Sequence, residues 1–283
     1  METIIAGIVS FNPDLKRLED NVKSIEHQVE YVLLVENGSK NQEEILSFLK
    51  EKFPKLWVII NTNNQGIAIA LNQLLEKSRN LGGKWLLTLD QDSISPDNLI
   101  SAYKNYLDME KVAMICPRII DRNSKMTVEH KDDGKNVPFV EVDRCITSAT
   151  LMNTDAANEI GNFDDKMFID YVDFEYCIRL RKEGYKILKV NETELLHELG
   201  NTVIKSLFGK KIQVLNHSPF RKYYYIRNIV YTYRKHKDVL PRFYCVKPIV
   251  VMYIKTLFFE NNKKEKLKKM YQGFLDGKKM ALS

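Results

Sequence analysis

Two carboxylates one residue apart, Asp90 and Asp92, follow the apolar run WLLTL at residues 85–89. Aspartate favours turns, so the pair could simply close a buried strand. Carboxylate oxygens are also ligands that Mg²⁺ and Mn²⁺ prefer, often completed by the phosphates of a bound nucleotide. From these residues alone, a turn and a metal site fit the spacing equally well.

A second acidic cluster lies in the stretch FIDYVDFEYCIRLRKEG at residues 168–184. A helix from 170 to 183 would place Asp170 and Asp173 on neighbouring positions and point Glu175 elsewhere. Acids at a helix start complement the helix dipole and need no further role. The aromatic residues between them indicate partial burial, and a partly desolvated carboxylate close to an acceptor hydroxyl is a candidate general base.

Two further candidates lie downstream. His197 follows an apolar pair and is a metal ligand if it faces the same crevice, and a structural residue otherwise. The run HSPFRKYYYIRN at 217–228 contains Arg221 and Arg227. Guanidinium groups bind phosphate well, but a helix that packs its aromatic residues and solvates its arginines explains the run equally well.

The elements that must position these residues alternate along the first hundred positions. Apolar runs at 4–9, 31–36, 56–61 and 85–89 predict buried strands, and the segments between them have the apolar spacing of helices. This alternation indicates a parallel sheet covered on both faces. Ligands bind such sheets beyond the carboxyl ends of the strands, so the polar ends SFNPD, ENGS, NTNNQG and DQDS should converge in one crevice.

The second half is less regular. VAMICP at 112–117 predicts a strand, and the polar segment 121–143 predicts a long loop or hairpin. RCITSATLMN at 144–153 and YKILKV at 185–190 predict two more strands, on either side of the helix at 170–183.

Composition excludes several classes of protein. The chain has 283 residues, of which 44% are hydrophobic and 28% charged, as in an ordinary folded protein. No GxGxxG or GxxxxGK[ST] motif supports dinucleotide or P-loop chemistry. The four cysteines have no metal-ligand spacing and indicate reduced thiols in a cytoplasmic protein. No signal peptide is recognisable, and the uncharged run 248–254 is too short to cross a bilayer.

The net charge of +6 is unevenly distributed. Residues 221–283 hold sixteen Lys/Arg and four Asp/Glu, whereas the other 220 residues hold 27 and 33. Near the C-terminus, apolar residues recur at i, i+3, i+4, i+7 and i+8, with lysines on the other side: Leu267, Met270, Tyr271, Phe274 and Leu275. This pattern predicts a basic amphipathic helix on an anionic membrane surface. The alternative is a helix packed on the protein body or on a second copy in a homodimer. No nucleic-acid-binding motif is present.

Seven motifs in this order resemble the family 2 glycosyltransferases of the GT-A fold, and most closely the bacterial rhamnosyltransferases that build O-antigen, capsule or cell-wall polysaccharides. They are SFNPD, VENGS, the run from Asn64 to Asn72, LDQDS, GNFDDKMFIDYVDFEYCIR, HELG and HSPFRKYYYIRN. The resemblance covers residues 1–235. It implies an α/β GT-A domain with a Rossmann-like nucleotide-binding half at 1–117 and an acceptor and catalytic half at 118–235, followed by the basic helical tail 236–283.

The resemblance implies a metal-dependent inverting glycosyltransferase. The expected donor is dTDP-β-L-rhamnose, the cofactor Mg²⁺ or Mn²⁺, and the acceptor a polyprenyl-diphosphate-linked saccharide or a growing surface polysaccharide. Such an enzyme would work in the cytoplasm, peripherally on the inner face of the cell membrane. Two alternatives stay open: a UDP-hexose or UDP-galactofuranose donor, or a non-catalytic sugar-nucleotide-binding scaffold subunit.

Residue roles follow from the same resemblance. Asp173 takes the position of the catalytic base, and Asp92, with Asp90 and His197, that of the metal site. Glu36 stands where the family more often has the aspartate that contacts the base, and Ser148-Ala149 where relatives often have Ser-Gly. The nucleotide-sugar side is expected to comprise Ser10, Phe11, Asn12, Glu36, Asn37, Asn64, Gly66, Asn72, Asp90, Gln91, Arg221 and Arg227, and the acceptor side Ser148, Asp170, Glu175 and Tyr224.

Overall fold

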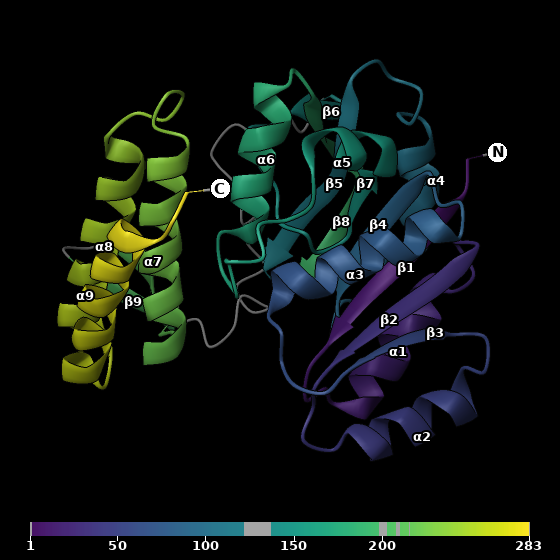
Figure 1. Cartoon of the computed structure of the whole chain (residues 1–283), viewed down its shortest axis with the longest axis horizontal. Coiled ribbons are helices and arrows are strands. Elements are labelled where there is room, and N and C mark those ends of the chain that lie inside the picture. Colours follow the sequence, from purple (N-terminus) through teal and green to yellow (C-terminus); the bar gives the residue numbers. More distant parts are fainter. Residues whose placement is uncertain (1, 122–136, 198–202, 208–209, 215, 283) are drawn as a thin grey trace. The chain divides into compact units, whose positions relative to one another are not determined.

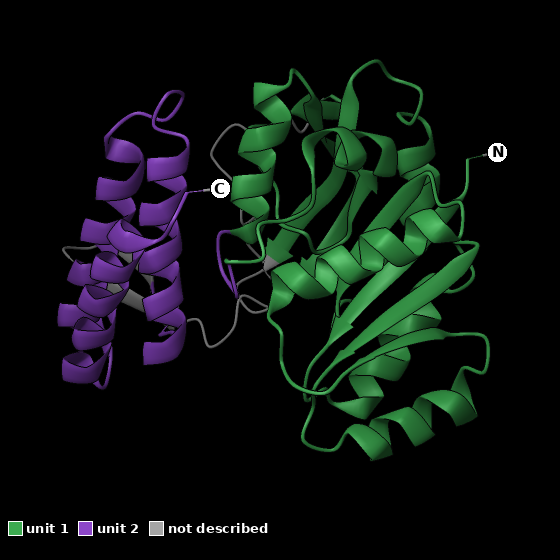
Figure 2. Cartoon of the chain, viewed as in Figure 1, with its two compact units in different colours: residues 1–166, 172–197 green, residues 167–171, 198–283 purple. Residues whose placement is uncertain are grey.

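The computed structural model describes residues 2–121, 137–197, 203–207, 210–214 and 216–282 (Figure 1). The chain divides into two compact units: unit 1 comprises residues 1–166 and 172–197, and unit 2 comprises residues 167–171 and 198–283 (Figure 2). The predicted boundary at residue 235 lies inside unit 2 of this division and stays a prediction. Within unit 2, the helix at 219–235 packs with the C-terminal helices.

Unit 1 is built on an eight-stranded sheet with the order β3-β2-β1-β4-β7-β5-β8-β6. The strands β1 to β4 are parallel, as predicted. Beyond β4 the sheet is mixed, because β7 runs antiparallel to β4 and β5, and β6 antiparallel to β8. The strands are β1 (Ile4–Ser10), β2 (Tyr31–Asn37), β3 (Trp57–Asn61), β4 (Trp85–Asp90), β5 (Val112–Asp121), β6 (Phe139–Glu141), β7 (Thr150–Asn153) and β8 (Lys186–His197).

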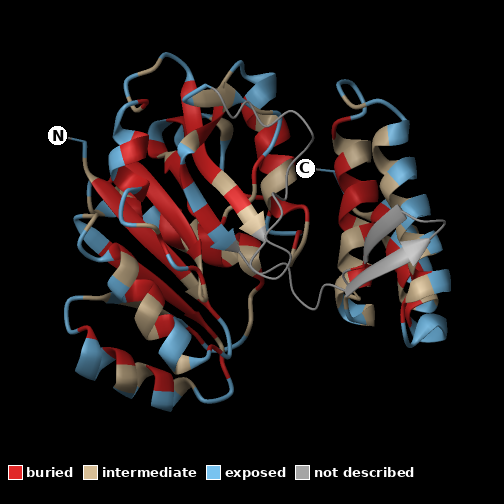
Figure 3. Cartoon of the chain, turned by 180° about the vertical axis from the view of Figure 1, so that it is seen from behind, coloured by how far each residue is buried: buried red, intermediate tan, exposed pale blue. Residues whose placement is uncertain are grey.

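Helices cover both faces of this sheet. Alternate residues of β1, such as Ala6 and Ile8, share a buried cluster with Leu18 of α1, whereas Gly7 between them lies against Leu74 of α3. The result is a continuous buried interior along the strands (Figure 3), made mostly of apolar side chains. The helices of unit 1 are α1 (Leu15–Ile25), α2 (Gln42–Lys52), α3 (Ile67–Asn80), α4 (Leu99–Lys104), α5 (Thr154–Ile160) and α6 (Val172–Lys182).

Three predicted elements differ from the structure. The strand predicted at 144–153 begins only at Thr150, since Ala149 is left-handed with φ 55°. The helix predicted from 170 begins at Val172, because Asp170 and Tyr171 have φ of 64° and 68°. Asp170 and Asp173 are therefore not neighbours on one helix. The last strand extends to 197, and most of the polar segment predicted at 121–143 lies outside the described residues.

Unit 2 contains the helices α7 (Pro219–Lys235), α8 (Phe243–Phe259) and α9 (Lys263–Lys279), and the antiparallel strands β9 (Val203–Leu207) and β10 (Lys210–Val214), which the sequence analysis did not predict. The helix α9 packs closely on α7 at Gly273 and Gly277. A Cβ atom at these positions would lie 2.4 and 2.5 Å from the carbonyl oxygens of Tyr223 and Arg227.

This packing corrects the predicted face of the C-terminal helix. The side of α9 that faces α7 carries Met270 and the two glycines, whereas Tyr271 is 61% and Phe274 37% exposed. The helix α9 therefore packs on α7 within its own unit, which was the alternative to a helix on a membrane surface. The predicted apolar stripe is split between a buried and an exposed side.

A buried charge cluster joins the three helices of unit 2. The Nζ atoms of Lys222 and Lys266 lie 2.8 and 2.9 Å from the two carboxylate oxygens of Glu260. Lys222 also donates to Thr256, and Lys266 to Asn216. Each charged side chain is at most 5% exposed. Because α7, the end of α8 and the start of α9 each supply one member, the cluster fixes these helices relative to one another.

Candidate active site

The polar strand ends predicted to converge are tied together by hydrogen bonds in unit 1. The amide of Phe11, after β1, donates to the side chain of Gln91, after β4, at 2.7 Å. The amide of Asn12 donates to Ser39 Oγ at 2.7 Å, and Asn12 Oδ1 accepts from the amide of Lys40 at 2.9 Å. The segments after β1, β2 and β4 therefore form one cross-linked edge of the sheet. This part of the prediction is confirmed.

Glu36 fixes the loop that follows β2 at this edge of the sheet. Its side chain is fully buried, and its oxygens accept from the amides of Gly38 and Ser39 and from the Gln42 side chain. Gly38 has φ 78°, and a Cβ there would lie 2.2 Å from the Asn63 backbone, so only glycine fits. The carboxylate therefore shapes the turn beside it, and its predicted contact with a base stays a prediction.

Asn37 and Asn64 connect the ends of β2 and β3. The amide nitrogen of Asn37 donates to Asn64 Oδ1 and to the carbonyl of Gly66, and its oxygen accepts from Asn61 and from the amide of Gln65. Asn64 Oδ1 also accepts from the amide of Gly66 at 2.9 Å. These side chains pre-form the loop that leads into α3.

The two aspartates that follow β4 differ in their surroundings. The carbonyl of Asp90 accepts from the side chain of Asn21 and from the amide of Ser93, which closes the turn. Asp92 has a 39% exposed side chain, 3.8 Å from a guanidinium nitrogen of Arg17 on α1. The turn and the exposed carboxylate thus coexist, since the turn is made by the backbone of Asp90.

The donor set at this edge fits Mg²⁺ or Mn²⁺, which take carboxylate oxygens and complete their shell with phosphate and water. No three His, Cys, Asp or Glu side chains gather into a metal cluster within the described part of the chain. Ligands beyond Asp90 and Asp92 would therefore come from the substrate or from His197. That residue ends β8, and its side chain lies outside the described part of the structure.

Two serines lie close to the same strand ends. Ser10, the last residue of β1, is fully buried, and its hydroxyl has no hydrogen-bond partner among the described residues. Ser148 is also buried, and its hydroxyl lies 3.0 Å from that of Ser93 in the DQDS turn. The predicted acceptor loop therefore contacts the predicted metal loop directly.

Asn72 has a structural role that differs from the predicted one. Its amide nitrogen donates to the carbonyl of Phe163 at 2.9 Å, and its oxygen accepts from the amide of Phe163 at 2.8 Å. Both ends of the side chain are thus used to hold the GNFDD segment against α3. The surroundings of Asn72 give no support to contact with a sugar nucleotide.

The acids Asp173 and Glu175 lie in the first turn of α6 but in different environments. Asp173 is half-buried, and its Oδ1 accepts from the amide of Phe174 at 2.9 Å. Glu175 is fully buried, and both its oxygens accept from Arg179. Arg179 also donates to the carbonyls of Ile160 and Asn162. Glu175 therefore fastens α6, through Arg179, to the segment after α5, and its burial gives no support to the predicted acceptor-side role.

Within unit 2, Arg221 pairs with Asp170. Nε and Nη2 of Arg221 each lie 3.1 Å from Asp170 Oδ1, and burial raises the pKa of Asp170 while Arg221 opposes that rise. The Asn228 side chain donates to the carbonyls of Ile169 and Asp170. The left-handed turn that precedes Asp173 is thus held by α7, and Asp170 and Arg221 position it rather than project as free groups.

Tyr224 and Arg227 stack on each other in unit 2. The guanidinium of Arg227 lies 4.5 Å from the centre of the Tyr224 ring, and that ring stacks on Phe168 at 5.2 Å. Arg227 also donates to the side chain of Asn228. The aromatic packing that the sequence left as an alternative is therefore present, with both residues half-buried.

Sequence reasoning missed several residues that build this site. Arg17, Ser39, Gln42 and Asn228 were not among the candidates, although Ser39 and Asn228 lie inside the quoted motifs VENGS and HSPFRKYYYIRN. Each of them has a partner 19 to 75 positions away, a contact that no local spacing reveals.

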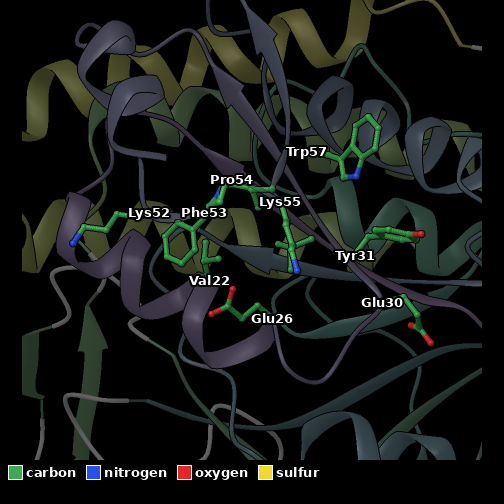
Figure 4. A pocket seen from close by; sticks show the side chains of 11 residues that line it. Val22, Glu26, Glu30, Tyr31, Lys52, Phe53, Pro54, Lys55 and Trp57 are labelled. Carbon is green, nitrogen blue, oxygen red and sulfur yellow. The ribbon is translucent and has the colours of Figure 1, made fainter. Parts of the chain in front are cut away.

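A groove of about 760 Å³ lies elsewhere on unit 1, at the amino ends of β2 and β3 (Figure 4). Its lining includes Tyr31, Trp57, Lys52 and Lys55. Because β1 to β4 are parallel, this groove is at the opposite end of the strands from Asp90 and Asp92. It is not the predicted crevice.

Comparison with known proteins agrees with the fold. The chain is 29% identical to the dTDP-rhamnosyl transferase RfbF of Shigella flexneri, over 97% of this chain and 95% of that protein. Two solved structures share the fold at a TM-score of 0.61. The first is GalNAc-T7 with UDP, GalNAc and Mn²⁺, at 16% identity over 85% of this chain, which spans 52% of that longer protein. The second is the mannosyltransferase PcManGT of Pyrobaculum calidifontis with GDP-Man and Mn²⁺, at 13% identity over 99% of this chain and 76% of that one.

The fold is therefore the GT-A fold of nucleotide-sugar-dependent enzymes. The sequence profile described as glycosyl transferase family 2 matches residues 6–161, which include most of β1, all of β2 to β4, the turn with Asp90 and Asp92, and α5. Because this match extends over more than half of the chain, the protein belongs to glycosyl transferase family 2 and is a glycosyltransferase.

Proposed function

We propose that this glycosyltransferase moves an L-rhamnosyl group from dTDP-β-L-rhamnose to a saccharide acceptor, with inversion at the anomeric carbon. The observation that carries the proposal is the 29% identity to a dTDP-rhamnosyl transferase over 97% of the chain. That similarity extends through both units and well beyond the family match at 6–161, into the part of the chain that holds Asp173 and α7.

The nucleotide would bind over the cross-linked strand ends of unit 1. The half-exposed ring of Phe11 offers a surface for stacking, and the buried hydroxyl of Ser10 lacks a protein partner among the described residues. Asn12, Asn37 and Asn64 hold the surrounding loops in place before the donor arrives. Such preorganisation lowers the ordering cost of binding.

The metal site of this proposal comprises Asp92 and Asp90, with His197 as a further ligand. A bound Mg²⁺ or Mn²⁺ would supply positive charge to the diphosphate oxygens of the donor. Arg17, 3.8 Å from Asp92, is a second cation at the same edge and lowers the repulsion that Asp92 presents to a diphosphate.

Asp173 is the proposed general base. Its carboxylate accepts the proton of the acceptor hydroxyl as that oxygen forms a bond to the anomeric carbon of the rhamnosyl group. The bond from this carbon to the diphosphate oxygen breaks on the opposite face, and dTDP leaves with the electron pair. A β-linked donor therefore gives an α-L-rhamnoside. The contacts of Asn228 and Arg221 to residues 169–170 hold the turn that precedes this base.

The proposed acceptor is a polyprenyl-diphosphate-linked saccharide or a growing surface polysaccharide. A lipid-linked acceptor lies at the inner face of the cell membrane, so we place the enzyme peripherally on that surface. The basic segment 221–283 supports this location, because anionic headgroups attract lysine and arginine.

A thermal-shift panel tests the donor. Binding of dTDP-rhamnose with Mn²⁺ should raise the melting temperature more than UDP-galactofuranose or a UDP-hexose does, because a ligand stabilises the folded state that binds it. The Asp92→Ala variant should lose the part of the shift that depends on Mn²⁺. A larger shift with a UDP-sugar would replace the donor in this proposal, and no shift with any nucleotide would favour a non-catalytic scaffold.

A further inference from the structure

The helix α8 exposes an unusual face within unit 2. Eight of its residues are exposed, and seven of them are large and apolar. At 100° per residue these positions fall on one side of the helix, and α8 contains no Asp or Glu. We call this the α8 apolar face: Phe243, Val246, Val250, Val251, Ile254, Leu257 and Phe258, which are between 41% and 69% exposed.

The opposite side of α8 is fixed to its own unit. Thr256 is fully buried and accepts from Lys222 of α7 at 2.9 Å, and Glu260, directly after the helix, accepts from Lys222 and Lys266. A rotation of α8 that buried the apolar face in unit 2 would break this charge cluster and leave buried lysines unpaired. The orientation of the face is therefore set by polar contacts behind it.

The charges around the face favour an anionic bilayer over a second copy of the chain. Lys247 is the eighth exposed residue of α8, and residues 236–283 hold eleven Lys/Arg against four Asp/Glu. An isologous dimer would bring two such basic faces together. A bilayer accepts the apolar side chains below its headgroups and lets a lysine reach back to the phosphates.

The helix α8 is short for one that crosses a bilayer, which needs about 20 apolar residues. Its 17 residues extend for about 25 Å, at about 1.5 Å per residue. None of the described helices is long and apolar enough to cross a bilayer. We propose that the α8 apolar face docks this protein on an anionic membrane, with α8 lying in the headgroup region. This surface would bring the enzyme to the lipid-linked acceptor. That link to the acceptor rests on the proposed function, whereas the membrane docking does not.

The test is co-sedimentation of the full-length protein with vesicles, without any donor. We expect binding to mixed phosphatidylcholine–phosphatidylglycerol vesicles, and weak binding to phosphatidylcholine alone. The triple variant Val250→Ser, Ile254→Ser, Phe258→Ser should bind the mixed vesicles at least about tenfold more weakly than the wild type. The reason is that three large apolar side chains no longer leave water on binding. The matched control is Trp57→Ser, Ile60→Ser, which removes exposed apolar side chains of β3 and should bind like the wild type.

Several outcomes would overturn the proposal. Wild-type protein that fails to sediment with the mixed vesicles would do so, as would a triple variant that sediments like the wild type. If the wild type is a dimer in sedimentation velocity and the triple variant a monomer, the occupant is a second copy. A triple variant that melts several degrees lower than the control would show that the face is packed within the chain. Because no sugar nucleotide is present, a wrong donor assignment leaves these results unchanged.

Discussion

The two units place their polar and apolar side chains in opposite ways. Unit 1 buries a continuous apolar core and gathers its carboxylates and amides at the strand ends, where Asp92 is 39% exposed. Unit 2 buries two lysines and a glutamate, each at most 5% exposed, and leaves the α8 apolar face exposed. The first arrangement suits a small polar ligand at a sheet edge. The second suits a large apolar partner, since only that partner removes the α8 side chains from water.

The largest expected effect concerns the catalytic role of unit 1. Asp173→Asn should lower rhamnosyl transfer by about 10²- to 10⁴-fold, the range of general base catalysis, while donor binding stays close to wild type. Steady-state transfer and calorimetry with dTDP-rhamnose measure the two quantities. The control is Asp165→Asn, an exposed acid eight positions earlier. Wild-type turnover by the Asp173 variant would remove this residue from the base position.

The buried charges of unit 2 should respond strongly to the loss of one partner. Glu260→Gln leaves Lys222 and Lys266 without their carboxylate and should lower the free energy of unfolding by about 3–5 kcal/mol. Hydrogen exchange should show the loss in α7, α8 and α9 and leave β1 to β4 protected. The exposed Glu265→Gln serves as control, and adding Lys266→Met to the variant should recover part of the stability. Equal loss in both units would show that they do not unfold independently.

The close contact between α7 and α9 tests the packing of unit 2 without a change of charge. Gly277→Leu should lower the free energy of unfolding by an amount at the upper end of about 1–3 kcal/mol. The reason is that the Cβ atom of the new side chain would lie 2.5 Å from the carbonyl oxygen of Arg227. Chemical denaturation measures the cost. Gln272→Leu adds the same side chain on the exposed side of α9 and should be nearly neutral. A neutral Gly277 variant would mean that α9 is not held against α7.

The smallest predicted effect is a pH dependence of unit 2. Burial, with help from Arg221 and Lys222, lowers the pKa of His217 from 6.5 to about 4. Between pH 4 and pH 6.5 the unfolded chain therefore binds a proton at His217 that the folded chain does not. The contribution of His217 to the stability of the fold is fully present above pH 6.5 and is lost as the pH falls toward 4. The ceiling on this change is about 3.5 kcal/mol, at about 1.4 kcal/mol per pKa unit, and the partial exposure of His217 to solvent reduces it.

Melting curves between pH 7 and pH 4 check this expectation. Hydrogen exchange shows how much of the loss of stability between pH 7 and pH 4 belongs to unit 2. His217→Gln should make this loss smaller, whereas the exposed His27→Gln should leave it unchanged. A decline that persists in the His217 variant would assign the pH dependence to other groups.

Much of unit 1 could be predicted from the sequence because its signals are local. Apolar runs that end in polar residues mark parallel strands, and the ends of parallel strands meet at one edge whatever the packing details. The convergence of Phe11, Asn12, Asn37 and Gln91 followed from that rule. The β7 reversal and the pair β9–β10 did not, since short strands carry little periodicity.

Several individual roles depended on partners far along the chain. Glu36 and Asn72 are polar residues at the predicted edge, but their oxygens and nitrogens are used by Gly38, Ser39 and Phe163. Glu175 is fully buried against Arg179. A sequence shows that a side chain is able to bind a ligand. It does not show whether the polar atoms of that side chain already form hydrogen bonds within the protein.

The sequence by itself determined the strand-and-helix order of residues 4–90, the exposed polar ends with Asp90 and Asp92, and the basic character of residues 221–283. The tertiary structure alone decided that α7 belongs with α8 and α9, that Cys145 and Cys177 are buried side by side, and that the exposed apolar face lies on α8 rather than α9. The physical reason is the range of the interactions. Periodicity and turns act between near neighbours, whereas the glycine contacts of α9 and the Lys222–Glu260–Lys266 cluster exist only once distant helices have packed.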